Sequence, residues 1–288
     1  MTTENQAKTI YVVIPVYNRK HFTKDCLISL RGQTYQNHKV IVVDDGSTDG
    51  TKEMLAEEFP DVIVLFGDGN LFWTKAINMG IRKALDLGAS YVLTLNNDTV
   101  ATPDFLEKMM YWSERTPDSL LGAFDLNFRT KKPYYAGEIV NWPLAKSRML
   151  LDELKESDLQ GIKEVSLFPA RGLLIPRKVF ETVGLYAEKE LPHYMADYDF
   201  TLLAARKGFK VYCNYDAKLY TYPDEGGDAK IKQKKKSLKS YYDHLFSIKG
   251  GANLKNFTIY TFRNCPWPYI PISLVMGYLR RLGGYWVK

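Results

Sequence analysis

The sequence predicts an α/β protein built on a mostly parallel sheet, and three observations support this fold class. Short apolar runs alternate with amphipathic, helix-like segments through the first hundred residues. The runs are continuously apolar, which is typical of strands covered on both faces. Acidic residues follow two of these runs, at the edge where open α/β sheets bind ligands.

The first half of the chain gives a regular order of elements. Strands are predicted at residues 11–14, 40–43, 62–66 and 91–95, and helices at 20–31, 51–59 and 74–87. Because right-handed crossovers connect parallel strands, the loops that follow all four strands should meet at one edge of the sheet.

The pattern changes after residue 97. A helix is predicted at residues 103–115, with proline in its first turn, and another at 196–207, with Gly208 as its C-terminal cap. A short strand is predicted at residues 211–213. Residues 116–170 are irregular, and their pattern predicts no strand pairing.

Size and composition are those of a globular protein. The chain has 288 residues, 45% of them hydrophobic and 25% charged, which allows one large domain or one domain with a tail. Its three cysteines are far apart and show no disulfide or zinc spacing, which fits a reducing compartment. The first eight residues lack the apolar core of a signal peptide, and no apolar stretch approaches the roughly 20 residues of a spanning helix. We therefore expect a cytoplasmic protein.

Two loops carry the first functional signal. Pro15 is expected to end the pairing of the first strand, so that Tyr17, Asn18 and Arg19 project over the sheet edge. The second strand ends in an acidic turn at residues 44–47. Together these loops resemble the nucleotide pocket of family 2 glycosyltransferases, which have the GT-A fold, a Rossmann-like sheet flanked by helices. The resemblance covers about residues 9–225.

The resemblance implies a nucleotide-binding role for these residues. Pro15, Tyr17 and Asn18 would pack against the nucleoside with Arg19 in the same pocket, and Asp45 would hydrogen-bond the base with Asp44 beside it. The competing interpretation is that residues 44–49 only form a turn and cap the next helix.

Residues 69–75 resemble a segment of the rhamnosyltransferase-like branch of this family. The resemblance implies that Asn70, Trp73 and Lys75 grip the nucleotide sugar, with Lys75 near the phosphates. The alternative is that Phe72 and Trp73 form a hydrophobic entry to the helix that follows.

Residues 96–98 occupy the position of the family's Asp-X-Asp metal motif, with Asn96 in place of the first acid. The resemblance implies a divalent cation, Mn²⁺ or Mg²⁺, held by Asp98 and the donor phosphates, with Asn97 in the nucleotide-sugar site. Family members often have a later histidine that joins the metal, but residues 219–223 contain none. Metal affinity should therefore be reduced.

Residues 191–200 match the family's acidic pair, with Ala196 in place of the first acid. The resemblance implies that Asp197 is the general base of an inverting transfer, with Asp199 supporting it; helix capping is the competing role for Asp197. On the acceptor side, Gly172 would let the backbone approach the sugar. Arg171 would face phosphate and His193 would lie near the acceptor.

The last part of the chain is predicted as a separate extension. We expect a catalytic domain at residues 1–225 and a basic, amphipathic helical extension at 226–288, with a lysine-rich run at 230–239. The apolar segment 269–279 is too short to span a membrane and precedes two arginines. The extension would contact the inner face of an anionic membrane, or else pack on the domain or across a dimer. No recognition motif for nucleic acid accompanies the lysines, so no nucleic-acid partner is expected.

The sequence therefore predicts a metal-dependent, inverting hexosyl- or deoxyhexosyltransferase. It would move a sugar from a UDP-, dTDP- or GDP-sugar to a hydroxyl of a surface glycan or lipid-linked precursor. A nucleotidyltransferase that makes an activated sugar is disfavoured, because residues 15–19 are not a glycine-rich loop. A dinucleotide-dependent oxidoreductase is also disfavoured, because no G-x-G-x-x-G fingerprint follows the first strand. A catalytically weakened partner with the same fold stays open because of Asn96, Asn97 and Ala196.

Overall fold

The structure, a computed structural model, describes residues 8–225 and 236–287. The strands of this part of the chain form a ten-stranded mixed sheet and a separate two-stranded hairpin. The main path of the large sheet runs through β10 (Ile162–Glu164), β12 (Val211–Thr221), β6 (Leu120–Asn127), β11 (Leu173–Pro176), β4 (Tyr91–Thr94), β1 (Ile10–Val16), β2 (His38–Asp44) and β3 (Ile63–Phe66). Beside this path lie β5 (Thr99–Ala101), paired with β12, and β7 (Pro133–Tyr135), paired with β6. The hairpin consists of β8 (Glu138–Asn141) and β9 (Lys146–Met149).

The four strands predicted in the first half are all present, and β4, β1, β2 and β3 lie side by side in parallel. One expectation at β1 was wrong: pairing with β2 continues past Pro15 to Val16. The physical reason is that the missing N–H of Pro15 faces the β4 side, where the ladder has already ended at the bond from Leu95 N–H to the Val13 carbonyl. Pro15 therefore costs the sheet no hydrogen bond.

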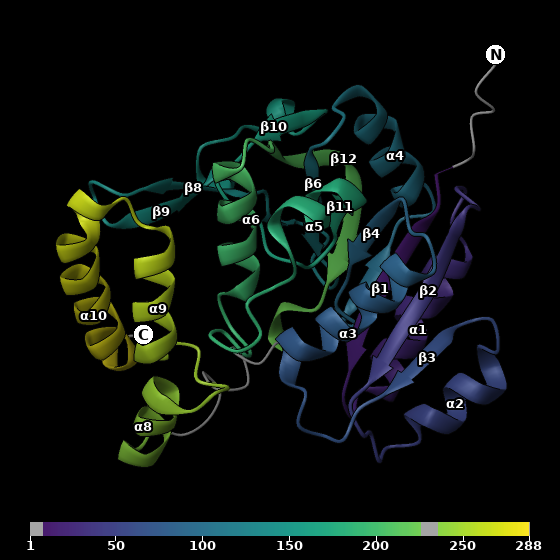
Figure 1. Cartoon of the computed structure of the whole chain (residues 1–288), viewed down its shortest axis with the longest axis horizontal. Helices are drawn as coiled ribbons and strands as arrows, with labels where there is room; N and C mark the ends of the chain where they lie inside the picture. The colour runs from purple at the N-terminus through teal and green to yellow at the C-terminus, as the bar shows by residue number, and fades with distance from the viewer. Residues whose placement is uncertain (1–7, 226–235, 288) are drawn as a thin grey trace.

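Helices cover both faces of the sheet (Figure 1). One face carries α3 (Phe72–Asp86), α5 (Arg177–Val183) and α6 (Ala196–Arg206), and the other carries α1 (Lys20–Arg31), α2 (Thr51–Glu58) and α4 (Phe105–Arg115). Successive residues of β1 point to opposite faces, so Val13 joins the core beneath α3 while Val12 joins the core beneath α1. This double coverage explains why the strands read as continuous apolar runs.

The region without predicted pairing, residues 116–170, contains most of the remaining strands. The eight-residue strand β6 runs parallel to β12. The predicted strand at residues 211–213 is thus too short, since β12 continues to Thr221 after an irregularity between Asn214 and Lys218. Single-turn helices occur at Leu150–Asp152, Glu156–Asp158, Pro223–Glu225 and Trp267–Tyr269.

The C-terminal part forms three helices, α8 (Leu238–Phe246), α9 (Leu254–Asn264) and α10 (Ile270–Val287), which lie beside α6 and far from β3 (Figure 1). Asp199 of α6 links them to the sheet domain, because Arg263 and Asn264 of α9 both donate hydrogen bonds to its carboxylate. Most of the predicted lysine-rich run, residues 230–235, lies outside the described residues. Within the described ranges, no helix is long and apolar enough to cross a membrane.

Candidate active site

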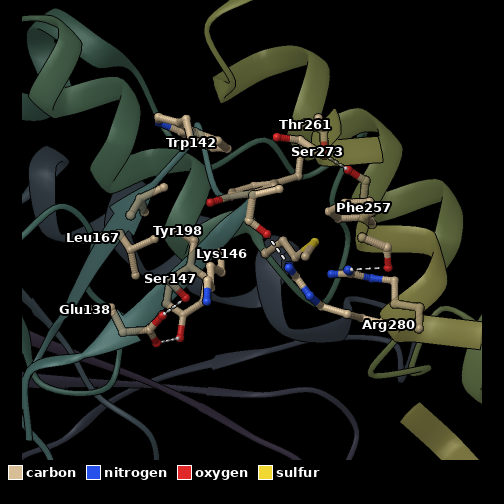
Figure 2. A pocket seen from close by; sticks show the side chains of 16 residues that line it. Glu138, Trp142, Lys146, Ser147, Leu167, Tyr198, Phe257, Thr261, Ser273 and Arg280 are labelled. Atoms are coloured by element: carbon tan, nitrogen blue, oxygen red, sulfur yellow. Dashed lines mark hydrogen bonds between the residues drawn. The ribbon is translucent and has the colours of Figure 1, made fainter. Parts of the chain in front are cut away.

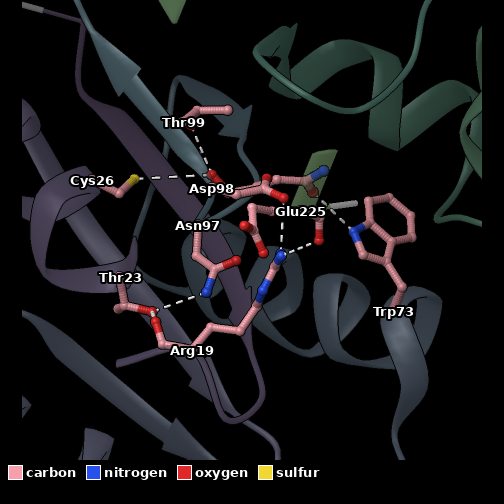
Figure 3. Close-up of polar contacts among 9 residues, drawn as sticks. Arg19, Thr23, Cys26, Trp73, Asn97, Asp98, Thr99 and Glu225 are labelled. Atoms are coloured by element: carbon pink, nitrogen blue, oxygen red, sulfur yellow. Dashed lines mark hydrogen bonds and ion pairs between the residues drawn. The ribbon is translucent and has the colours of Figure 1, made fainter. Parts of the chain in front are cut away.

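The centre of the candidate site is an ion pair at the edge of the parallel strands (Figure 3). Arg19, in the loop after β1, places Nη1 2.8 Å from Oδ2 of Asp98, which follows β4. The same guanidinium donates to the carbonyl of Glu225, after β12. One arginine therefore holds together the loops after β1, β4 and β12, which are far apart in the sequence.

The two asparagines before Asp98 are already engaged in hydrogen bonds. The Asn96 Oδ1 accepts a bond from the Trp73 indole at 3.2 Å, and the Asn97 Nδ2 donates to the Thr23 hydroxyl at 2.9 Å. Asn97 is buried. Their visible role is to fix the loop that presents Asp98.

The expected divalent cation would have one carboxylate ligand at this site, that of Asp98. Among the described residues, no group of three or more His, Cys, Asp or Glu side chains is arranged to hold a metal. One carboxylate is nevertheless compatible with Mg²⁺ or Mn²⁺, which in nucleotide sites take one or two carboxylates and complete their shell with substrate phosphates and water. The residues fit such an ion on the condition that Arg19 releases Oδ2 of Asp98.

The acidic turn after β2 is shaped by hydrogen bonds to backbone N–H groups. Asp44 is buried and accepts from the Ser47 N–H at 2.9 Å, so it acts as a turn residue, as the competing interpretation proposed. Asp45 accepts from the N–H groups of Gly69 and Leu71 at 2.9 and 3.0 Å. Asp45 thus ties the loop after β3 to the loop after β2, and each of its oxygens retains a lone pair for a ligand donor.

Asn18 joins the first two loops. It has a positive φ of 52°, its N–H donates to the Ser47 hydroxyl, and its Oδ1 accepts from the Thr48 N–H at 2.7 Å. Tyr17, next to it, is 49% exposed and so offers a ring face over the sheet edge.

Lys249 is a site residue that the sequence did not reveal. Its ammonium lies 5.6 Å from the ring centroid of Tyr17 and 5.7 Å from that of Phe72, within cation–π range. Lys249 comes from the turn after α8, so the C-terminal extension reaches the predicted nucleotide pocket. No local pattern marks this lysine, because its position depends on how the extension folds back.

The segment after β3 contributes residues with different environments. Trp73 is held by Asn96 and packs edge-on against Tyr186 at 5.7 Å between ring centroids. Asn70 is exposed and its amide is turned to the Asp68 carbonyl, while Lys75 is exposed on α3. Trp73 therefore links the loops after β3 and β4, whether or not it also contacts a ligand.

Asp197 lies in the first turn of α6, but it is not the N-cap residue, which is Met195 with φ 71°. Its carboxylate accepts from the N–H of Tyr198 at 2.9 Å and from that of Ala170 at 3.4 Å. Burial nevertheless raises the pKa of Asp197 above its ordinary value. A carboxylate with a raised pKa is a better proton acceptor than a free one, which suits a general base.

Arg171 connects the two acidic centres. It forms an ion pair with the fully buried Asp125 of β6 at 2.5 Å, and its charge acts on both Asp98 and Asp197. The sequence missed Asp125, because it lies in the region without predicted strands. Its Oδ1 has no hydrogen-bond partner among the described residues.

Two residues predicted for the acceptor side have packing roles. Gly172, with φ 74°, has no room for a side chain, since an added Cβ would lie 2.4 Å from Leu219 and 2.8 Å from Ala123. The glycine is needed for packing between strands. Asp199 is 2% exposed and is occupied by α9, so it anchors the extension and does not face an acceptor.

His193 lies near the loop of Phe72, with ring centroids 6.4 Å apart. Its Nδ1 is buried without a partner among the described residues. Burial, reinforced by the charge of Lys249, lowers the pKa of His193 to about 4, so the imidazole is neutral near pH 7.

A family comparison agrees with this geometry. The family model described as Glycosyl transferase family 2 matches residues 11–183, more than half of the chain. The chain belongs to glycosyl transferase family 2. The matched residues run from β1 through α5 and so include the loops of Arg19, Asp45, Asp98 and Arg171.

Curated relatives from this family are distant and often longer. The glycosyltransferase GlyA of Streptococcus pneumoniae is 31% identical over 181 residues, which are 60% of this chain and 25% of GlyA. The dTDP-rhamnosyl transferase RfbF of Shigella flexneri is 27% identical over 210 residues, 73% of this chain and 68% of RfbF. An uncharacterized glycosyltransferase of Rickettsia typhi is 29% identical over 209 residues, with 69% of this chain and 59% of that protein covered. The chain thus spans less than two thirds of several relatives that it matches.

Solved structures show the same fold. A crystal structure of S. aureus TarS superposes with a TM-score of 0.60 at 14% identity, covering 95% of this chain and 54% of TarS. TarS 1–349 in complex with UDP gives a TM-score of 0.58 at 14% identity, covering 96% of this chain and 91% of that one. The GT-A fold expected from the sequence is therefore confirmed.

Proposed function

We propose that this protein transfers a sugar from a nucleoside-diphosphate donor to a hydroxyl of a surface glycan or lipid-linked precursor, with inversion at the anomeric carbon. The observation that carries this proposal is the position of Arg171, whose charge acts on Asp98 on one side and on Asp197 on the other. This supports the proposal that the phosphate-binding residues and the base belong to one site. Family membership supports the reaction class.

The donor half is proposed to consist of the loops after β1, β2 and β3. Tyr17 would stack on the base and Asp45 would accept a hydrogen bond from it. Exposure of Tyr17 and the free lone pairs of Asp45 support these roles. The printed description of TarS with UDP and that of RfbF as a dTDP-rhamnosyl transferase support UDP- or dTDP-sugars as the first donors to test; a GDP-sugar remains in the proposal.

Asp98 is proposed to hold Mn²⁺ or Mg²⁺ together with the donor phosphates. When bound, the cation would offset the negative charge that develops on the leaving diphosphate. Arg19 donates from the same place, and its Nη1, once released from Asp98, would bind a phosphate oxygen while Nη2 keeps its bond to the Glu225 carbonyl.

In the transfer step, Asp197 would accept the proton of the acceptor hydroxyl as that oxygen attacks the anomeric carbon. A new carbon–oxygen bond forms, and the bond from the anomeric carbon to the phosphate oxygen breaks. The nucleoside diphosphate leaves with the bonding electron pair. Attack from the face opposite the phosphate inverts the configuration.

The test is to measure donor binding and turnover separately. Thermal shifts with UDP-, dTDP- and GDP-sugars, with and without Mn²⁺, should show stabilisation by at least one donor, because a ligand that prefers the native state stabilises it. Sugar release from that donor should then be lost in Asp197→Asn while the thermal shift is kept. Stabilisation by none of the donors would overturn the donor proposal. A donor that binds without any turnover would instead favour the catalytically weakened partner.

We also propose that residues 226–288 form an extension to the catalytic domain and contact the inner face of the cell membrane, with the enzyme acting in the cytoplasm. Large apolar side chains are exposed along α10 at helical spacing: Ile272, Val275, Met276, Leu279, Leu282 and Trp286. Lys239 on α8, which contacts α10, is exposed and suits an anionic headgroup layer. Co-sedimentation with vesicles of phosphatidylglycerol, but not of phosphatidylcholine alone, is expected and should be lost in Leu279→Asp. Equal binding of the parent protein and Leu279→Asp to the phosphatidylglycerol vesicles would contradict the membrane proposal.

A further inference from the structure

A cavity of about 240 Å³ lies where the C-terminal helices meet the β8–β9 hairpin (Figure 2). Its walls come from β8, β9 and the turn between them, from the start of α6, and from the facing sides of α9 and α10. The close contact of α9 with α10 requires Gly277, since an added Cβ would lie 1.9 Å from the Phe257 ring. The cavity therefore exists only because the extension folds onto the domain.

Four aromatic side chains give the cavity a mainly apolar wall, namely Trp142, Tyr198, Phe257 and Tyr260. The rings of Trp142 and Tyr260 lie 6.4 Å apart between centroids. A concave site with aromatic walls and a few placed polar groups is the usual form of a small-molecule site. Ring faces also suit the apolar faces of a sugar or polyol.

The charged groups of this cavity are mostly cationic. Arg281 stacks on Phe257, with 3.6 Å from its Cζ to the ring centroid, and Lys146 and Arg280 line the same space. Glu138 is the one acid in the lining, and its two oxygens accept from the Tyr198 hydroxyl at 3.1 Å and the Ser147 hydroxyl at 2.6 Å. The cations therefore outnumber the acid.

Among the residues that the structure describes, no acidic side chain forms an ion pair with Arg281. Its Nε is buried without a hydrogen-bond partner in the described part of the chain, and its Nη1 donates to the Gly277 carbonyl of its own helix at 3.3 Å. Burial lowers the pKa of Arg281 to about 10. A buried guanidinium is strongly stabilised by a charge-assisted bond to an oxyanion, so the cavity is suited to an anion.

The cavity adjoins the proposed catalytic base. Met195 and Tyr198, which line it, flank Asp197 in the first turn of α6. Burial is the main cause that raises the pKa of Tyr198 and of Tyr260, and the charge of Asp197 adds to it. A molecule in this cavity would thus contact the residues on either side of the proposed base, although Asp197 itself is not in the lining.

We propose that this cavity is the acceptor site and that the acceptor is an anionic carbohydrate, whose phosphate or carboxylate binds Arg281 while its carbon skeleton lies on the aromatic walls. The proposal rests on the proposed glycosyl transfer and names the acceptor class for it. It also gives the C-terminal extension a role in acceptor choice.

Binding of small probes tests the proposal without any transfer reaction. Calorimetric titrations at constant ionic strength would use glucose 6-phosphate, glucuronate and glucose. Glucose 6-phosphate or glucuronate, or both, should bind about ten-fold or more tightly than glucose, as expected for one charge-assisted hydrogen bond. The stronger of the two anions identifies whether phosphate or carboxylate is preferred. Equal binding of all three probes, or binding of none, would overturn the proposal.

Variants locate the bound anion. Arg281→Met should weaken anion binding about ten-fold or more, whereas Arg148→Met should leave it unchanged. Arg148 lies on β9 but outside the cavity and pairs with Glu153, which makes it a matched control. If Arg281→Met does not fold, Lys146→Met serves instead, because Lys146 is exposed, and a smaller loss is expected. Unchanged binding in the folded variant would refute the assignment.

Competition with UDP separates this site from the donor pocket. Saturating UDP should leave anion binding in place, whereas displacement by UDP would mean that the anion occupies the donor phosphate site. If UDP binds and neither anion does, the acceptor inference fails alone. If the anions bind as expected and no donor is bound or turned over, the proposed function fails and the cavity remains an anion site.

Discussion

Arg19 donates to Asp98 across 2.8 Å, and this bond joins the end of β1 to the end of β4 although 79 residues separate the two in sequence. The guanidinium therefore stands where a metal ion would approach the carboxylate. A divalent cation and Arg19 should compete for Asp98, because the two positive charges would repel each other at one carboxylate.

This competition predicts the effect of removing the arginine. Arg19→Met should bind Mn²⁺ more tightly than the parent protein when UDP is present, while Asp98→Asn should lose most of its Mn²⁺ affinity. Titration calorimetry with Mn²⁺ would measure the affinity of each protein. EDTA should reverse any rise in melting temperature that Mn²⁺ causes. Equal Mn²⁺ affinity in all three proteins would mean that Asp98 is not a metal ligand.

The raised pKa of Asp197 predicts opposite effects on activity and stability. Because burial disfavours the charged carboxylate, the charge destabilises the fold once the pH rises through the raised pKa. Asp197→Asn should therefore have a higher melting temperature at pH 7 than the parent protein, while transfer is lost. In the parent, transfer should fall as pH drops through this pKa. A lower melting temperature in the variant would show that the hydrogen bonds to Asp197 outweigh its burial.

Lys249 should contribute to binding of the donor phosphates. Lys249→Ala is expected to weaken UDP binding about three- to ten-fold, as for loss of one charged contact, and to leave uridine binding unchanged. Lys255→Ala is the control, because Lys255 is also an exposed lysine of the extension, whereas the ammonium over Tyr17 and Phe72 is that of Lys249. An equal loss of UDP and uridine binding would assign Lys249 to the nucleoside instead.

The ion pair of Asp199 with Arg263 should stabilise the whole chain. Arg263→Met leaves Asp199 buried with Asn264 as its remaining donor from α9, and is expected to lower the free energy of unfolding by about 3 kcal/mol. Urea denaturation would measure this loss. The double variant Asp199→Asn with Arg263→Met should recover part of it, because no uncompensated charge remains. No recovery would mean that lost packing, not the charge, explains the effect.

His193 should make the protein sensitive to acid. Its pKa is about 4 in the folded state and about 6.5 when unfolded, so the unfolded chain binds the proton first as the pH falls. The stability present above pH 6.5 should thus decrease between about pH 6.5 and 4. In His193→Gln, the melting temperature should decrease less steeply over this pH interval than in the parent protein. Identical pH profiles would rule out His193 as the cause.

Much of the parallel half of the fold was predictable from the sequence. The strands β1 and β4 and the second half of β2 are buried on both faces, so they appear as apolar runs, and the shared direction of β1–β4 fixes where Asp45 and Asp98 lie. The family motifs around Tyr17, Asp98 and Asp197 were recognisable because each is a short, contiguous segment.

The antiparallel half was not predictable in this way. The strands β7, β9 and β10 are short and partly exposed, so they carry no continuous apolar signal. Asp125 and Lys249 reach the site from β6 and from the extension, and the role of Gly172 depends on Leu219 and Ala123 from neighbouring strands. These contacts join residues far apart in the chain.

The sequence by itself determined the family, the parallel strands and the carboxylates at their ends, because these depend on local patterns of burial and on contiguous motifs. Only the tertiary structure decided which carboxylate is paired with Arg19, which with Arg171 and which with Arg263. Pairing of charges is set by the packing of segments that are distant in sequence, and no local pattern encodes it.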